Sequence, residues 1–185
     1  MGNAAASGRV SVRDLTHEDL PILGELLRER WGSGSVASHG RLIDATTGPG
    51  FIAEADGAWV GYCAFEPVEH DCQLVAIESL QPGTGVGSAL LARLARWCLE
   101  HDMVRLWLVT TNDNTEALRW YQRRGFTLAG VRFGAVTTAR RKLKPEIPLY
   151  GCDGIEIRDE LELELSPERW AETRAAPGLD DEPPR

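Results

Sequence analysis

Apolar and polar residues alternate along the first part of the chain in a pattern that predicts strands and one helix. RVSVRDLT, at 9–16, alternates like a strand, and residues 17–31 carry apolar side chains at helical spacing. Residues 50–68 predict two strands joined by a tight turn at Asp56-Gly57. The unbroken apolar run CQLVAIESL, at 72–80, predicts a third strand that is buried on both faces.

The second part of the chain predicts helices and strands in alternation. One apolar stripe predicts an amphipathic helix over 86–100, and its members are Leu90, Leu94, Trp97 and Cys98. The run VRLWLVTT at 104–111 predicts a strand parallel to 72–80, with the helix as the crossover between them. A further helix is predicted within 112–126, followed by strands over 126–136 and 154–166.

Two connections interrupt this order. Residues 31–50 are rich in Gly, Ser and Thr, which predicts a long, mobile connection with a short helix at 40–45. Residues 140–154 predict a loop between the last two strands. Substrate choice is expected to reside in such loops.

Length and composition fit one domain, since the chain has 185 residues of which 43% are hydrophobic. We expect a flexible tail over 1–8, the domain over 9–165 and a second flexible tail over 166–185. No window has the apolar length of a signal peptide or a membrane span, so we expect a cytoplasmic protein without membrane contact. The four cysteines lie far apart, which favours buried free thiols over a metal site or a disulfide framework.

Charge is unevenly distributed along the chain. The formal net charge is −8, which makes nucleic acid an unlikely partner, yet residues 117–145 contain eight basic and no acidic side chains. Such a basic segment suits a small polyanionic ligand such as a phosphorylated cofactor, although solvated surface charges explain any single member equally well.

The stretch PGTGVGSALLARL, at 82–94, places glycines at 83, 85 and 87 where a strand gives way to a helix. Glycine weakens a helix, so three glycines at this point indicate that the backbone must stay free of side chains. The first N–H groups of a helix have no partner within it and lie at the positive end of its dipole. Glycines at this point let phosphate oxygens approach these groups, and the stretch therefore predicts an anion-binding site.

A second motif follows the next strand. Asn112, Asp113 or Asn114 can cap the helix that begins there, and Gly125 can end it. Asn114 and Tyr121 are seven residues apart, close to two helical turns, so both side chains project from one face. A ligand lying along that face can contact both.

Together these motifs resemble the GNAT superfamily of acetyl-CoA-dependent N-acetyltransferases. The resemblance rests on the strand ending in ESL, the PGxGxG turn at 82–87, SALL at the start of the helix, and N-x-x-A-x-x-x-Y-x-x-x-G-F at 114–126. It covers about 9–165 and implies an α/β (α+β) fold of the acyl-CoA N-acyltransferase type. In that fold a mixed, mostly antiparallel central sheet, flanked by helices, is splayed between two parallel strands.

The resemblance also implies roles for individual residues. Acetyl-CoA would bind with its pyrophosphate on the turn and its pantetheine arm along the preceding strand end and the following cap, and the residues concerned are Ser79, Leu80, Gln81, Gly83, Thr84, Gly85, Val86, Gly87, Ser88 and Asn114. Tyr121 would lie near the sulfur. The sequence departs from the family pattern at Pro82, which donates no N–H, and the side chain of Gln81 is expected to compensate.

The chemistry of acyl transfer adds two catalytic candidates. A phenol stays protonated at neutral pH, so Tyr121 can protonate the leaving thiolate, although a core tyrosine is the alternative. The attacking amine must lose a proton, and Glu78 is the first candidate base because it interrupts a buried run. A salt-bridged carboxylate explains Glu78 as well, and the nearby Glu69, His70 and Asp71 remain alternatives.

Asp159 is the polar member of an otherwise apolar row in 154–166, where it either lies near the acceptor or pairs with an Arg or a backbone turn. The acidic segments 69–78 and 156–164 favour a cationic acceptor, such as a polyamine, an aminoglycoside or a protein amine, while the basic segment leaves a charged tRNA as an alternative acceptor.

Three further points concern the oligomeric state and the alternative functions of the chain. A homodimer is possible. A dinucleotide-binding domain is disfavoured, because the glycine turn follows three strands and no acidic residue ends the next strand. A non-catalytic acyl-CoA-binding sensor with the same fold is the remaining alternative.

Overall fold

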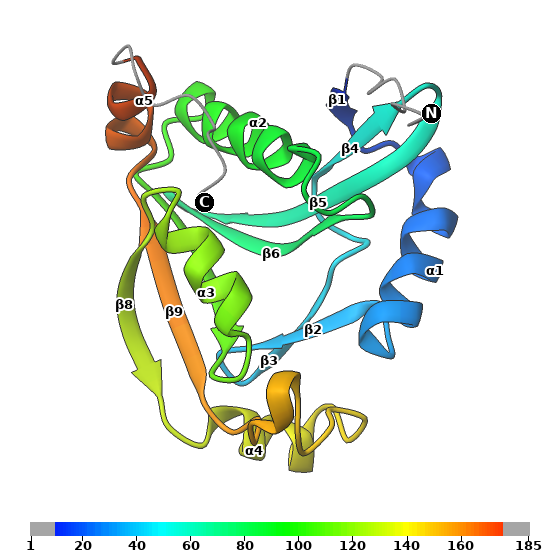
Figure 1. The fold of residues 1–185 in the computed structure, drawn as a ribbon, viewed down its shortest axis with the longest axis vertical. Helices are drawn as coiled ribbons and strands as arrows, with labels where there is room; N and C mark the ends of the chain where they lie inside the picture. The colour runs from blue at the N-terminus through cyan, green and yellow to red at the C-terminus, as the bar shows by residue number, and fades with distance from the viewer. Residues whose placement is uncertain (1–9, 176–185) are drawn as a thin grey trace, which may run out of the picture.

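The structure is a computed structural model that describes residues 10–175, and its centre is one mixed β-sheet (Figure 1). Over the described residues the sheet has seven strands in the order β1-β4-β5-β6-β7-β9-β8. These strands are β1 (Ser11–Asp14), β4 (Gly50–Ala55), β5 (Ala58–Val68), β6 (Asp71–Ser79), β7 (Arg105–Thr111), β8 (Thr127–Arg132) and β9 (Glu160–Leu165). A separate hairpin consists of β2 (Ser35–Ser38) and β3 (Arg41–Asp44).

Helices cover both faces of this sheet (Figure 1). They are α1 (Leu20–Trp31), α2 (Val86–Glu100), α3 (Thr115–Gln122), α4 (Ala135–Lys142) and α5 (Pro167–Ala175), with short 3-10 turns η1 (His17–Asp19) and η2 (Cys152–Gly154). The predicted stripe of α2 is buried, since Leu90, Leu94 and Cys98 are each 0% exposed. On the opposite face, Leu23 and Leu27 of α1 pack with Ile43 of the hairpin and Tyr62 of β5.

The strands β6 and β7 run parallel, joined by α2, but they pair over only part of their length. Their register runs from Asp71↔Arg105 to Leu74↔Leu108, after which the two strands separate. Val75 is an extra residue of β6 at a bulge against β5, and a bulge bends the strand that carries it. Beyond this point β6 stays paired with β5 and β7 with β9. The predicted fold class, a mostly antiparallel sheet splayed at two parallel strands, is confirmed.

The predicted connection at 31–50 is wrong in its detail. It contains the hairpin of β2 and β3 and no helix at 40–45. His39 and Gly40 both have positive φ, 49° and 76°, which is the backbone of a two-residue hairpin turn. Gly40 in this conformation ends β2 and turns the chain back, so a helix cannot start there.

Boundaries near the end of the chain also differ from expectation. The strand expected over 126–136 stops at Arg132, and α4 begins after Gly134, whose φ is 67°. The strand expected over 154–166 begins only at Glu160. Within the segment expected as a tail, α5 packs against α2, while the tail expected over 1–8 lies outside the described residues.

Three of the four cysteines are buried, namely Cys63, Cys72 and Cys98, whereas Cys152 is exposed. Among the described residues, no helix has both the length and the apolar character that crossing a bilayer requires.

Leu90 provides a test of this core. We expect Leu90→Ala to lower the free energy of unfolding by about 2–5 kcal/mol, because the side chain is fully buried between α2 and the sheet. Leu149→Ala is the matched control, since Leu149 is 59% exposed, and its effect should stay within about 0.5 kcal/mol. Chemical denaturation measures both. Equal effects of the two variants would contradict this packing.

Candidate active site

The glycine-rich turn before α2 has the backbone of an anion-binding loop. Gly83 and Gly85 have φ angles of 80° and 82°, and Gly85 is the N-cap of α2. A Cβ at either position would have no atom within 4 Å, so it is the left-handed backbone that requires glycine there. The Thr84 hydroxyl donates to the Gln81 carbonyl at 2.6 Å and fixes the turn. Beside the start of α2, the space around both glycine Cα atoms is therefore open on the side where a Cβ would stand.

Gly87 is required for a different reason. A Cβ at this position would lie 3.1 Å from Cζ2 of Trp120, so the indole ring of α3 packs directly on the bare backbone. Our interpretation of all three glycines as ligand access is thus incomplete, because Gly87 serves helix packing. This contact brings α3 against the first turn of α2.

Arg124, a member of the basic segment for which we predicted no individual role, lies at this helix start. Its Nη2 donates to the Ser88 hydroxyl at 2.8 Å, and its guanidinium stacks on Trp120 with 3.9 Å from Cζ to the ring centroid. It therefore adds a positive charge beside the turn. The sequence does carry a signal for the contact with Trp120, because Arg124 follows it by four residues, the spacing of side chains that share a helical face.

Two other members of the basic segment, Arg140 and Lys144, bond to backbone carbonyls of the chain itself. Arg140 donates to the carbonyls of Ile147, Pro148 and Ile157 at 2.7–2.8 Å. The Lys144 ammonium donates to the Ser35 carbonyl at 2.6 Å, and burial lowers its pKa.

The end of β6 borders the opening between the parallel strands. The Leu80 N–H donates to the Val60 carbonyl of β5 at 2.8 Å. Backbone groups of successive strand residues point to opposite edges, so those of Ser79 point toward the opening. Val86 is 0% exposed, so its side chain belongs to the core and only its backbone is available to a ligand.

Asn114 and Tyr121 lie on α3 at the other side of the opening. Asn114 is the N-cap, and its Oδ1 accepts from the Ala117 N–H at 3.2 Å, which leaves the Nδ2 donor for a ligand. Tyr121 is 8% exposed and contacts the edges of Trp120 and Phe126. Burial raises its pKa, and its hydroxyl has no hydrogen-bond partner among the described residues.

Glu78 lies on the opposite face of the sheet and has two partners. Its Oε1 is 2.5 Å from Nε of Arg30, and its Oε2 accepts from the Tyr62 hydroxyl at 2.9 Å. Burial and then the Glu78 charge raise the pKa of Tyr62. The alternatives Glu69, His70 and Asp71 lie at the other end of β6, about 23 Å away along the strand at its usual rise.

Three polar residues near the end of β7 hold loops in place. The Asn112 side chain accepts from the N–H groups of Arg158 and Asp159, at 2.9 and 3.0 Å. Asp113 is 4% exposed and accepts from the Cys152 N–H at 3.2 Å. Asp159 accepts from the Gly134 N–H and from Nε of Arg158, both at 2.8 Å, so it takes the structural role considered for it.

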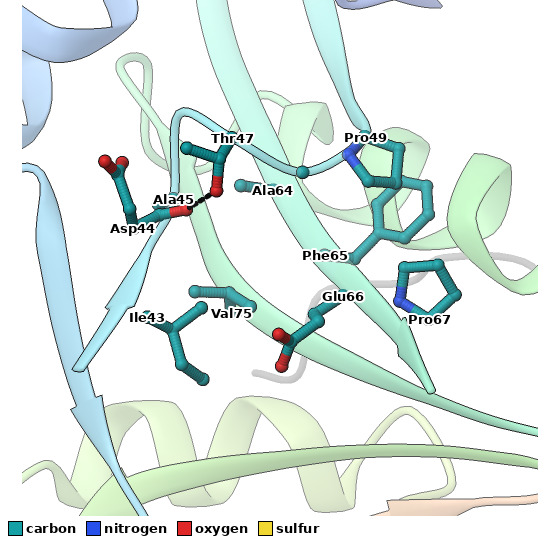
Figure 2. A pocket seen from close by; sticks show the side chains of 11 residues that line it. Ile43, Asp44, Ala45, Thr47, Pro49, Ala64, Phe65, Glu66, Pro67 and Val75 are labelled. Carbon is teal, nitrogen blue, oxygen red and sulfur yellow. Dashed lines mark hydrogen bonds between the residues drawn. The ribbon is translucent and has the colours of Figure 1, made fainter. Parts of the chain in front are cut away.

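A cavity of about 210 Å³ lies between the segment after β3 and strands β5 and β6 (Figure 2). Figure 2 shows Ile43 and Val75 on one side of it and Pro49 and Pro67 on the other. Val75 is the bulged residue of β6, so the cavity lies on the hairpin face near the splay. None of the residues predicted for the site lines it.

A sheet that parts at a parallel strand pair, with a glycine turn and a helix start beside the opening, defines the class of acyl-CoA N-acyltransferase folds. The model of the acetyltransferase (GNAT) family matches residues 11–126, and the chain belongs to this family. The Bacillus subtilis protein YxbD, described as uncharacterized, is 35% identical over 144 residues, which are 77% of this chain and 89% of that protein.

Solved structures share the fold. The IAA acetyltransferase from Bacillus cereus has a TM-score of 0.63 and 17% identity, covering 85% of this chain and 99% of that one. A GNAT family acetyltransferase from Elizabethkingia anophelis with acetyl-CoA bound has a TM-score of 0.62 and 17% identity, covering 85% and 97%.

Asp159 gives a pH-dependent prediction. The Gly134 N–H and then Arg158 lower its pKa from the usual value of 3.8, so its charge stabilises the fold above that value and stops doing so as the pH falls. We expect Asp159→Asn to lower the melting temperature by a few degrees at pH 7 and by less at pH 3. Glu156→Gln, at an exposed neighbour, is the control. A loss that is the same at both pH values would contradict a role for the charge.

Proposed function

We propose that the protein transfers the acetyl group of acetyl-CoA to an amine of a small molecule or protein, by direct attack in a ternary complex. The observation that carries this proposal is the opening between β6 and β7, which has the glycine turn of α2 at one end and Tyr121 at its side. Acetyl-CoA supplies an activated thioester, so no covalent enzyme intermediate is required.

The residues around the opening fit this co-substrate. The N–H groups from Gly83 to Ser88 and the charge of Arg124 suit a pyrophosphate, with Gln81, exposed at the start of the turn, beside them. The backbone of Ser79 and the Nδ2 of Asn114, which has no partner among the described residues, suit the amide groups of a pantetheine arm, whereas the Leu80 N–H is already bonded to Val60.

Tyr121 and Glu78 are proposed as the acid and the base. The buried phenol stays protonated at neutral pH and can donate to the sulfur as it leaves as a thiolate. Arg30 and Tyr62 fix the orientation of the Glu78 carboxylate, which can take the amine proton directly or through one water. The two groups act from opposite faces of the sheet: Glu78 takes the proton of the amine that adds to the thioester carbonyl, and Tyr121 donates to the sulfur as the tetrahedral intermediate expels the thiolate.

The glycine turn yields a matched pair of variants. Gly85→Ala and Gly57→Ala place a side chain at φ 82° and 78°, so each should cost about 1–2 kcal/mol of stability. Only Gly85→Ala distorts the proposed pyrophosphate site, and it should weaken acetyl-CoA binding about ten-fold or more. Isothermal titration calorimetry measures this. Equal affinities of the two variants for acetyl-CoA would contradict a role of the turn in binding.

A variant at Tyr121 tests the proposed acetyl transfer. We expect Tyr121→Phe to keep acetyl-CoA affinity and folding, because the hydroxyl has no protein partner among the described residues, and to lower kcat about 100-fold or more. Tyr150→Phe, at a tyrosine that is 64% exposed, should leave kcat unchanged. Thiol release with a panel of amines is the assay. Saturable acetyl-CoA binding without turnover of any amine by the wild type would favour a sensor instead.

A further inference from the structure

A second group of polar residues lies on the face of the sheet covered by the hairpin, and the mechanism above does not use it. We refer to it as the hairpin-tip site, and its members are Ser38, His39, Gln73, Trp107, Glu160 and Glu162. The His39 ring stacks on Trp107 with centroids 4.9 Å apart. The His39 N–H donates to Glu160 at 3.3 Å, and Nε2 lies 2.8 Å from Glu162. The tip of the hairpin thus reaches across the sheet to β9.

The carboxylates of this region outnumber its cations. Arg105 pairs with three of them, Asp71, Glu162 and Glu164, at 2.5–3.3 Å. Within residues 10–175, the one guanidinium paired with Glu160 is that of Arg132, at 3.6 Å. Four carboxylates therefore face two guanidinium groups, and even a protonated His39 leaves one negative charge unbalanced among the described residues.

Glu160 is the least compensated of the four. It is 3% exposed, and its closest donor is the His39 N–H at 3.3 Å. Burial raises its pKa, only partly offset by His39 and Arg132. A buried carboxylate with such weak partners destabilises a fold, so its presence points to a partner that arrives from outside.

Gln73 supplies a second, independent observation. Its side chain is 2% exposed and its Nε2 donates to the Ser38 hydroxyl at 2.8 Å, beside His39. Its Oε1 has no hydrogen-bond partner in the described part of the chain. A buried amide oxygen without a donor costs free energy, and an ammonium group would supply the missing N–H.

The register places the site at the apex of the splay. Gln73 pairs with Trp107 directly before the last pair of β6 and β7, and Glu162 lies opposite Val109, the first β7 residue beyond that pairing. Paired residues share a face, so these side chains all lie on the hairpin side of the sheet. An extended ligand in the opening ends next to them.

We propose that the hairpin-tip site binds a second ammonium group of the acceptor, through Glu160, Glu162 and the Gln73 oxygen. The acceptor is then a polyamine rather than a monoamine, and this inference rests on the proposed acetyl transfer. The first amine is acetylated in the opening, while the second ammonium stays bound at the apex. The charge of Glu160 and Glu162 and the amide oxygen of Gln73 together provide the selectivity for a polyamine over a monoamine.

The test compares two acceptors of equal length, 1,5-diaminopentane and 1-aminopentane, with the full chain. We expect the wild type to use the diamine with a kcat/KM about ten-fold higher or more, and Glu160→Gln to reduce this preference to about two-fold or less with an unchanged KM for acetyl-CoA. Glu160→Gln keeps the shape and removes a buried charge, so it should fold. Glu100→Gln, at an acid on the far side of α2, is the control.

A binding measurement separates this inference from the proposed function. In the presence of CoA, the diamine should raise the melting temperature of the wild type but not that of Glu160→Gln or Gln73→Met. Equal kcat/KM values for both amines in the wild type would overturn the site while leaving acetyl transfer in place. No thiol release with any amine would overturn the proposed function, and diamine stabilisation that depends on Glu160 would then still support the site.

Discussion

The early separation of β6 and β7 is the constraint on which the rest of the structure depends. Only the pairs from Asp71↔Arg105 to Leu74↔Leu108 hold these strands together. Backbone N–H and C=O groups need partners, and beyond Leu74 and Leu108 those on the facing edges of β6 and β7 receive none from each other. The roles proposed for the glycine turn, Asn114 and Tyr121 depend on this opening. The bulge at Val75 and the full pairing of β7 with β9 keep it open.

The two faces of the sheet differ in charge at this opening. On one face, the start of α2 and Arg124 present positive charge beside the glycine turn. On the other, Glu78, Glu160 and Glu162 present carboxylates beneath the hairpin and α1. This division suits a reaction that joins a polyanionic donor to a cationic acceptor, because each is attracted to its own side.

Much of the fold was predictable because its signals are local. The stripe of α2, the turn at Asp56-Gly57 and the parallel pairing through α2 follow from periodicity and turn chemistry. The hairpin at 35–44 was missed because its strands are short and its turn uses His39 in a left-handed conformation, which few side chains adopt. The packing of α5 was missed because its sequence is mostly polar, so it resembles a tail.

The sequence by itself determined the motifs that one helix or one turn can carry: the glycines before α2, the Asn114 cap and the position of Tyr121 two turns later. Only the tertiary structure decided which charged groups meet. It paired Glu78 with Arg30, made Asp159 a partner of Gly134, and brought His39 to Glu160 across 121 positions of the chain. Spacing along a helix is fixed by backbone geometry, whereas contacts between distant segments depend on how the whole sheet pairs and bends.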